Sequence, residues 1–269
     1  MRNALAIARK ELSIYFTTPW AWVVFTAMSF LSSAFFLSLF SDFNRAQRRA
    51  AERGWNAVHP AEHIYKNLTD GVVVQLWGVV LIVILFVAPF LSMRLFAEEK
   101  RQKTMELLMT TPVRTIEIVI GKYLGGLGAI STTIGLTIVY PIIISVVASG
   151  SSESGSALEW GTVALGYGGL LLWGGTCIAI GMLISSLTES QMLAAILTFA
   201  VLLPWMLISY WAANSDEPLR SILNYLSFSE QLANMMRGVL DLKALVFFAS
   251  IVAMSILLTH RSVESQRWS

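Results

Sequence analysis

Charged residues and cysteines are both scarce in this chain of 269 residues, and each scarcity excludes a class of protein. Asp, Glu, Lys and Arg make up 13% of the sequence against 55% hydrophobic residues, a balance that a single soluble core could not hide from water. Cys177 is the one cysteine, so the sequence offers neither a disulfide framework nor a cysteine-ligated metal site. We therefore expect the bilayer to be the solvent for most of the chain.

A phosphate-binding loop is also missing. Such a loop reads Gly-x-x-x-x-Gly-Lys-Ser/Thr between a strand and a helix. The Gly-Lys pair formed by Gly121 and Lys122 is followed by Tyr123, and Ile116 stands where the first glycine would be needed. The chain is therefore not expected to hydrolyse ATP by that route, and we predict no catalytic residue in it.

One segment, HPAEH at residues 59–63, fits the His-x-x-Glu-His spacing of an inverted zinc-peptidase site. Zinc chemistry needs both imidazoles on one helical face and a third ligand, whereas Pro60 would start a helix and leave His59 at its cap. We interpret the segment as the start of a helix in an external loop and predict no metal site. A membrane-embedded metalloenzyme built on this loop stays open as an alternative.

What the sequence does contain is a series of long apolar runs separated by polar segments. A helix that crosses the hydrocarbon core needs about 20 residues, and six runs reach that length or come close to it. The predicted fold class is all-α, a polytopic membrane protein forming a single domain over residues 1–269. Its six predicted spans are residues 20–40, 72–96, 118–148, 160–183, 192–211 and 242–258.

Residues 1–18 mix apolar side chains with Arg9, Lys10 and Glu11, which predicts a short interfacial helix before an uncleaved signal anchor. Basic residues here and between spans two and three favour cytoplasmic N- and C-termini. Residues 41–70 are predicted to form an external, partly helical loop. The five basic residues of that loop make the preference for this orientation a modest one.

Residues 214–241 are too polar to span a membrane, yet apolar residues recur in them at helical spacing. An amphipathic external helix at the outer interface, before the last span, would bury that apolar face. The residues are Leu219, Ile222, Leu223, Leu226, Leu232, Met235, Met236 and Val239.

The spans themselves carry little chemistry from which a substrate could be read. No ionisable residue stands in mid-span, where proton pumps and ion-coupled transporters place them. Gly121, Gly125 and Ala129 repeat small residues every four positions, which predicts that span three packs tightly against a neighbouring helix or a second copy of the chain.

The most specific segment, residues 97–124, reads AEEKRQKTMELLMTTPVRTIEIVIGKYL. Its charged start, followed by TMELL and TTPV, predicts a short cytoplasmic helix that ends before a proline. Leu107, Leu108 and Met109 give that helix an apolar surface beside a charged one, suited to docking in a groove on a soluble partner. On physical grounds alone, an ordinary interfacial helix fits the segment equally well.

This segment resembles the coupling region of ABC type-2 permeases, which typically reads acidic-basic, Gly-Thr, Glu, Leu-Leu, Thr/Ser, Pro and then Gly-Lys-Tyr. The stretch ARKEL at residues 8–12, followed by Thr18 and Pro19, is similar to the N-terminal connecting helix of the family. Residues 226–228 and 237–242 resemble the stretch before the last span, most closely in the gliding-motility-associated branch. Lys103 departs from the pattern, because the family commonly has glycine at that position.

The resemblance implies a non-catalytic permease subunit of an ATP-driven export complex. Its expected partners are two copies of a soluble ABC ATPase subunit, a second permease that makes a homodimer, an accessory membrane or periplasmic subunit, and the lipid bilayer, with no nucleic acid. The chain is expected to bind no cofactor, since ATP and Mg would be held by the ATPase. An ATP-independent channel or membrane scaffold is the alternative function.

The resemblance also implies which residues would contact the ATPase. The coupling region is residues 97–113, and a turn after span four would make a second, weaker contact. The residues carried over are Glu98, Glu99, Lys100, Arg101, Thr104, Glu106, Leu107, Leu108, Thr111 and Pro112, with Leu187, Thr188 and Glu189 in the second contact.

Overall fold

The computed structural model describes residues 2–54, 67–105, 113–149 and 158–265, and every regular element within them is helical. Six helical segments among these residues are long and apolar enough to cross a membrane. The prediction of an all-α polytopic fold with six spans is therefore confirmed. The elements are α1 (Arg2–Thr17), α2 (Pro19–Arg53), η3 (Thr69–Val74), α3 (Gln75–Ser92), α4 (Arg94–Arg101), α6 (Thr115–Gly135), η4 (Leu136–Ile138), α7 (Val139–Ser149), α8 (Trp160–Leu187), α9 (Gln191–Ala213), α10 (Leu219–Leu226), α11 (Phe228–Met236) and α12 (Leu242–Ser265).

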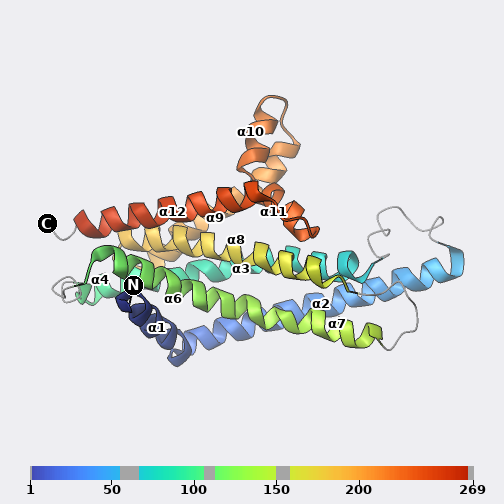
Figure 1. The fold of residues 1–269 in the computed structure, drawn as a ribbon, viewed down its shortest axis with the longest axis horizontal. Helices are drawn as coiled ribbons and strands as arrows, with labels where there is room; N and C mark the ends of the chain where they lie inside the picture. The colour runs from blue at the N-terminus through green and yellow to red at the C-terminus, as the bar shows by residue number, and fades with distance from the viewer. Residues whose placement is uncertain (1, 55–66, 106–112, 150–157, 266–269) are drawn as a thin grey trace.

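The long helices run side by side as an elongated bundle (Figure 1). In the spans that contain α3 and α8, 67% of the most apolar window is buried inside the molecule, whereas the corresponding share is 17% to 22% for the spans of α2, α9 and α12. The helices α3 and α8 therefore form the centre of the bundle. The outer helices expose large apolar side chains such as Phe30 and Leu37, as expected of surfaces that face lipid or another membrane helix.

The helix α1 runs obliquely to the bundle, at the same end as α4 and the C-terminal end of α12 (Figure 1). We call this end of the bundle the α4 end. Thr18 separates α1 from α2 because its backbone is extended, with φ −91° and ψ 131°. Pro19 then starts α2, a position that suits proline because the first helical residue has no intrahelical use for its N–H group. The chain thus turns sharply between the two helices, at an elbow formed by Thr18 and Pro19.

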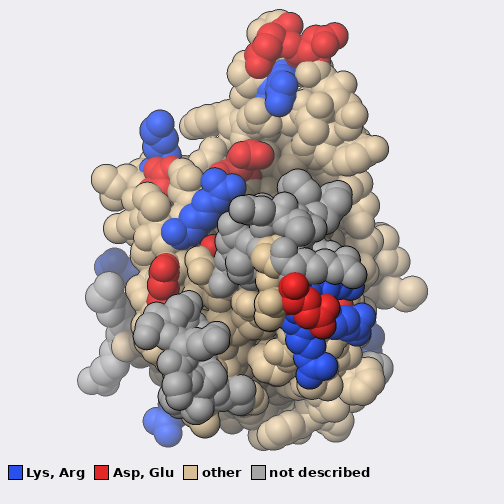
Figure 2. Space-filling model, turned by 90° about the vertical axis from the view of Figure 1, so that its right-hand side faces the viewer, with Lys and Arg blue, Asp and Glu red and all other residues tan. Residues whose placement is uncertain are grey.

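The helix α2 has 35 residues, so at 1.5 Å per residue it is about 50 Å long and exceeds the roughly 30 Å hydrocarbon core. Its polar last turns project from the end opposite to α4 (Figure 1), and Figure 2 looks onto that end, where charged side chains of both signs are exposed. The predicted external loop therefore begins as a continuation of the first span. Arginine, alanine and glutamate are good helix formers, so the helix continues until Gly54, which adopts a positive φ of 76°.

The predicted amphipathic helix in residues 214–241 is divided into α10 and α11. Ser227 causes the division: its backbone is extended, and its hydroxyl caps α11 by accepting a hydrogen bond from the N–H of Glu230. α10 projects sideways from the bundle (Figure 1), while α11 turns back against α8. There the ring of Phe228 stacks on that of Trp173 with 3.8 Å between centroids. The apolar residues are thus shared between an outward helix and one that enters the bundle.

Candidate functional site

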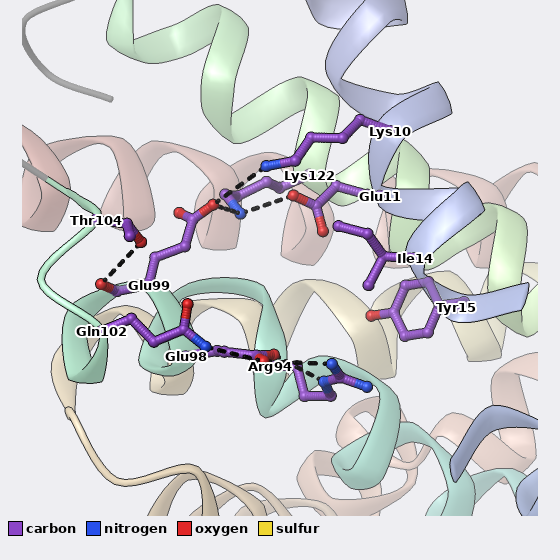
Figure 3. A pocket seen from close by; sticks show the side chains of 10 residues that line it. All are labelled: Lys10, Glu11, Ile14, Tyr15, Arg94, Glu98, Glu99, Gln102, Thr104 and Lys122. Carbon is purple, nitrogen blue, oxygen red and sulfur yellow. Dashed lines mark hydrogen bonds and ion pairs between the residues drawn. The ribbon is translucent and has the colours of Figure 1, made fainter. Parts of the chain in front are cut away.

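A buried lysine joins three helices at the α4 end. The ammonium nitrogen of Lys122, in α6, lies 2.9 Å from Oε1 of Glu11 in α1 and 2.9 Å from Oε1 of Glu99 in α4 (Figure 3). Lys122 is only 1% exposed and Glu11 only 8%, so neither charge is solvated as it would be at a surface. We call these three residues the Lys122 cluster. Buried charges are tolerated when they are paired with opposite charges, and here one ammonium group pairs with two carboxylates.

Two further groups surround the same ammonium group. It lies 5.2 Å from the centroid of the Phe96 ring, a distance at which a cation is attracted to an aromatic face. The ammonium nitrogen of Lys10 lies 4.0 Å from Oε1 of Glu99, at the exposed edge of the cluster. The ring of Phe96 thus covers one side of the cluster, and Lys10 lies at its exposed edge.

Glycines on α6 allow α1 to approach so closely. A β-carbon added at Gly121 would lie 2.8 Å from the carbonyl oxygen of Ala4, and one added at Gly125 would lie 2.5 Å from the β-carbon of Glu11. Neither separation is tolerated between real atoms, so α1 could not lie here against larger residues. The close neighbour of Gly121 and Gly125 is thus the N-terminal helix rather than another span. Ala129, the third residue of that repeat, is fully buried.

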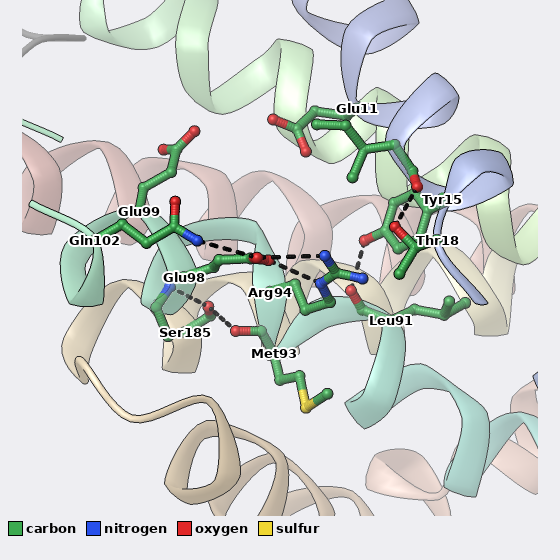
Figure 4. Close-up of polar contacts among 12 residues, drawn as sticks. Glu11, Tyr15, Thr18, Leu91, Met93, Arg94, Glu98, Glu99, Gln102 and Ser185 are labelled. Atoms are coloured by element: carbon green, nitrogen blue, oxygen red, sulfur yellow. Dashed lines mark hydrogen bonds and ion pairs between the residues drawn. The ribbon is translucent and has the colours of Figure 1, made fainter. Parts of the chain in front are cut away.

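A second set of contacts fastens α1 to the junction of α3 and α4. The hydroxyl of Tyr15 donates a hydrogen bond of 2.5 Å to the carbonyl of Leu91 (Figure 4). Burial, together with the nearby carboxylates of Glu11 and Glu98, raises the pKa of Tyr15, so this hydroxyl stays protonated and can donate. Beside this bond, an ion pair within α4 joins Arg94 Nε to Oε2 of Glu98, one helical turn further along the chain, at 2.8 Å.

The charged side chains line a cavity of about 410 Å³ between α1, α4 and α6 (Figure 3). Its charged lining consists of three basic and three acidic residues, so the formal charges balance: Lys10, Arg94, Lys122, Glu11, Glu98 and Glu99. Because each charge already has an opposite charge beside it, the cavity needs no ion to neutralise it. We interpret the arrangement as a polar joint between helices rather than as a binding site.

The geometry at the end of α4 shows why the family commonly has glycine at the position that Lys103 occupies in this chain. The N–H of Lys103 bonds to the carbonyl of Lys100, and the N–H of Thr104 bonds to that of Glu99, both at 3.0 Å. This pair of bonds closes the helix as a Schellman motif, which places one residue in the left-handed conformation. Lys103 is that residue, with φ 55°. The position therefore has the geometry that favours glycine, although lysine occupies it.

The same helix is bonded to the end of α8. The hydroxyl of Ser185 accepts from the N–H of Phe96 at 3.1 Å and donates to the carbonyl of Met93 at 2.9 Å (Figure 4). The ammonium group of Lys100 donates to the carbonyl of Ser186. These bonds place the predicted second contact beside the first, at one end of the bundle.

The predicted coupling residues thus have different surroundings. Glu98 and Glu99 face the joint, Lys100 is bonded to the end of α8, Arg101 is exposed and Thr104 lines the cavity. In the second contact, Leu187 and Glu189 are exposed and Thr188 is half-buried. The residues that would form the apolar docking surface lie outside the described residues, and that surface stays a prediction: Glu106, Leu107, Leu108, Thr111 and Pro112.

The zinc-like segment at residues 59–63 also lies outside the described residues. Within the part of the chain that the structure describes, no group of three or more His, Cys, Asp and Glu side chains could hold a metal ion.

Sequence patterns did not single out the Lys122 cluster. Glu11 and Lys122 are 111 residues apart, and each can be read as an interfacial charge when only its own neighbours are considered. A signal was nevertheless present, because Lys122 stands between the small residues Gly121 and Gly125 of a predicted span. A lysine on a tightly packed face requires a carboxylate from whichever helix packs there.

Comparison with known proteins agrees with this architecture. The family model described as ABC-2 family transporter protein matches residues 5–261. A comparison with curated proteins finds no match. Proteins of this family are the membrane-spanning permease components of ABC transporters, in keeping with the six membrane-crossing helices. The chain therefore belongs to the ABC-2 transporter family and is a multi-pass membrane protein.

Proposed function

We propose that this chain is the permease half of an ATP-driven exporter, and that a separate ABC ATPase subunit docks at the α4 end. The observation that carries the proposal is the Lys122 cluster. Its three residues come from the three stretches that resemble the family's connecting helix, coupling region and Gly-Lys-Tyr motif. Stretches far apart in sequence thus converge on one joint, and the segment predicted to receive the partner follows α4 in the sequence.

The joint suggests how movement would pass from the ATPase to the spans. A displacement of α4 would carry Glu99 with it, and Glu99 holds Lys122 of α6, which in turn holds Glu11 of α1. Coupling requires that the docked region prefers one ATPase arrangement over the other, and about 5 kcal/mol of preference shifts an equilibrium almost completely. ATP and Mg would be bound by the ATPase, so this chain would supply the mechanical connection alone.

The same proposal sets the partners and the orientation. Two permeases, expected to be copies of this chain, would pair with two ATPase subunits, and an accessory subunit could join them. The exposed apolar faces of α2 and α9 supply surface for lipid and for a second copy. The α4 end would be cytoplasmic, in a bacterial inner membrane, and the chain would belong to the gliding-motility-associated branch that residues 226–228 and 237–242 resemble. The alternative of an ATP-independent channel or scaffold makes the opposite prediction about an ATPase.

Co-purification tests the proposal directly. The full chain is tagged and purified from membranes of its native host, and both the co-purified ABC ATPase and its ATP hydrolysis are measured. Leu107→Asp is expected to abolish co-purification while the permease stays in the membrane, because a charge would be placed on the predicted apolar docking surface. Leu240→Asp, at an exposed leucine of the loop before α12, is the matched control and should retain the ATPase. Full retention and normal turnover in Leu107→Asp would refute the docking claim.

A further inference from the structure

A second cavity, of about 390 Å³, lies at the elbow between α1 and α2. We call it the elbow cavity. One part of its wall is apolar and comes from the first turns of α2 and the end of α3, and includes Ala21, Val24 and Phe90. The other part is polar and comes from α4 and the start of α9, and includes Arg94, Arg101 and Gln191. Figure 4 shows Tyr15, Thr18, Leu91 and Arg94 along this wall.

The polar part of the wall has an excess of positive charge. Arg94 is paired at 2.8 Å with Glu98, which also lines the cavity, so Arg101 is the second arginine of the lining and gives it a formal charge of one positive unit. Arg101 is exposed, and no carboxylate among the described residues lies within ion-pair distance of its guanidinium group. This differs from the cavity at the Lys122 cluster, where the formal charges balance. An anionic group would therefore be attracted to the elbow cavity.

The position of the elbow cavity relative to a bilayer narrows the choice of anion. Its apolar residues belong to membrane-crossing stretches, and Arg101 is the last residue of one of them, Thr69–Arg101, which ends in the polar helix α4. Phe90 is 53% exposed, so the apolar wall continues onto the surface that faces the hydrocarbon. Trp22, on the first turns of α2, is exposed as interfacial tryptophans are, and its indole N–H donates to the carbonyl of Phe16. The cavity thus spans the boundary between acyl chains and headgroups.

We propose that the elbow cavity binds one anionic phospholipid from the leaflet at the α4 end. The headgroup phosphate would contact Arg101, with the side-chain amide of Gln191 as a further hydrogen-bond donor. The part of an acyl chain nearest the headgroup would lie along Val24 and Phe90. This site depends on the membrane setting of the chain and not on ATP coupling. Its failure would therefore leave the proposed function untouched, and the reverse also holds.

Native mass spectrometry of the full-length protein in mild detergent tests the site. The protein is titrated with phosphatidylglycerol or with phosphatidylcholine of the same acyl chains. Arg101→Gln is expected to weaken phosphatidylglycerol binding about fivefold, the effect of one basic residue near an anionic bilayer surface. Arg261→Gln is the matched control, because its side chain is 82% exposed at the same end and lies outside the cavity. Binding of phosphatidylcholine should be equal in all three proteins.

A second variant tests the apolar wall without changing any charge. Val24→Phe would occupy the space of the acyl chain, so phosphatidylglycerol binding should fall while the protein stays folded. A photoactivatable phosphatidylglycerol should crosslink within residues 18–24 or 90–101 of the wild type. Unchanged affinity in both variants, or an equal loss in Arg261→Gln, would overturn the proposal. Displacement of the lipid by millimolar inorganic phosphate would also overturn it and would indicate a soluble phosphate compound instead.

Discussion

Replacement of Lys122 by methionine would test whether the buried ammonium group holds the joint together. The change keeps an unbranched side chain of similar length and removes the one charge that faces both Glu11 and Glu99 at 2.9 Å. Oε2 of Glu99 is buried and has no hydrogen-bond partner among the described residues, so that carboxylate depends on its lysine contacts. Removal of one partner from a buried ion pair costs about 3 to 5 kcal/mol, and Lys122→Met is expected to lower the free energy of unfolding by that amount.

A triple variant separates the loss of charge from the loss of packing. Lys122→Met combined with Glu11→Gln and Glu99→Gln keeps the volumes but leaves no unpaired charge in the joint. Neutral replacements for a whole buried ion pair are often tolerated, so the triple variant should recover most of the stability lost in the single variant. If the lysine served only to fill space, the triple variant would unfold as early as the single one.

Thermal unfolding of the full chain in detergent, followed by tryptophan fluorescence, is the measurement. A loss of 3 to 5 kcal/mol in a chain of this size lowers the apparent Tm by roughly 10 °C. Lys243→Met removes an exposed lysine from the start of α12 and should leave the apparent Tm unchanged. An apparent Tm for Lys122→Met equal to that of the wild type would refute the assignment of the cluster as the joint.

Three further variants test the packing around the same joint, with the same thermal assay. Lys103→Gly should raise the free energy of unfolding by about 1 kcal/mol, because glycine adopts the left-handed conformation without the steric cost that lysine meets there, and a lower stability would contradict the Schellman geometry. Gly125→Ala should separate α1 from α6 and lower the apparent Tm, whereas Gly135→Ala, which has open space around its added carbon, should not. Tyr15→Phe should cost about 1 kcal/mol through the lost hydrogen bond, and no change would show that this bond does not hold α1.

The membrane-crossing helices could be predicted from the sequence because the bilayer imposes a minimum apolar length on each of them. The stretch predicted as residues 160–183 lies within α8, and that predicted as residues 242–258 lies within α12. The polar continuation of α2 was harder to predict. Its arginines and Glu52 are typical of a surface loop by polarity, yet they are strong helix formers, and helix propensity prevailed up to Gly54.

The division of residues 214–241 into two helices has a different physical origin. Helical spacing of apolar residues does not distinguish one helix on a surface from two short helices with separate partners. The deciding contacts are tertiary: Phe228 stacks on Trp173, and the indole N–H of Trp205 donates to the carbonyl of Leu226 at 2.8 Å. The Lys122 cluster was hidden for the same reason, since its members come from three separate segments of the chain.

The Lys122 cluster also limits how this end of the molecule can move. The ammonium group cannot leave either carboxylate without a desolvation cost of several kcal/mol, so α1, α4 and α6 are expected to move as one unit. Movement would then be taken up where the backbone is already interrupted. One such place is the elbow at Thr18 and Pro19, and a second is the turn at Met93 between α3 and α4. A third is η4, a short 3₁₀ turn just before Pro141 that breaks the third span into α6 and α7. These interruptions border the unit held by the cluster, so a push on α4 would move α1 and α6 together with it, and with the end of α8 that is bonded to α4.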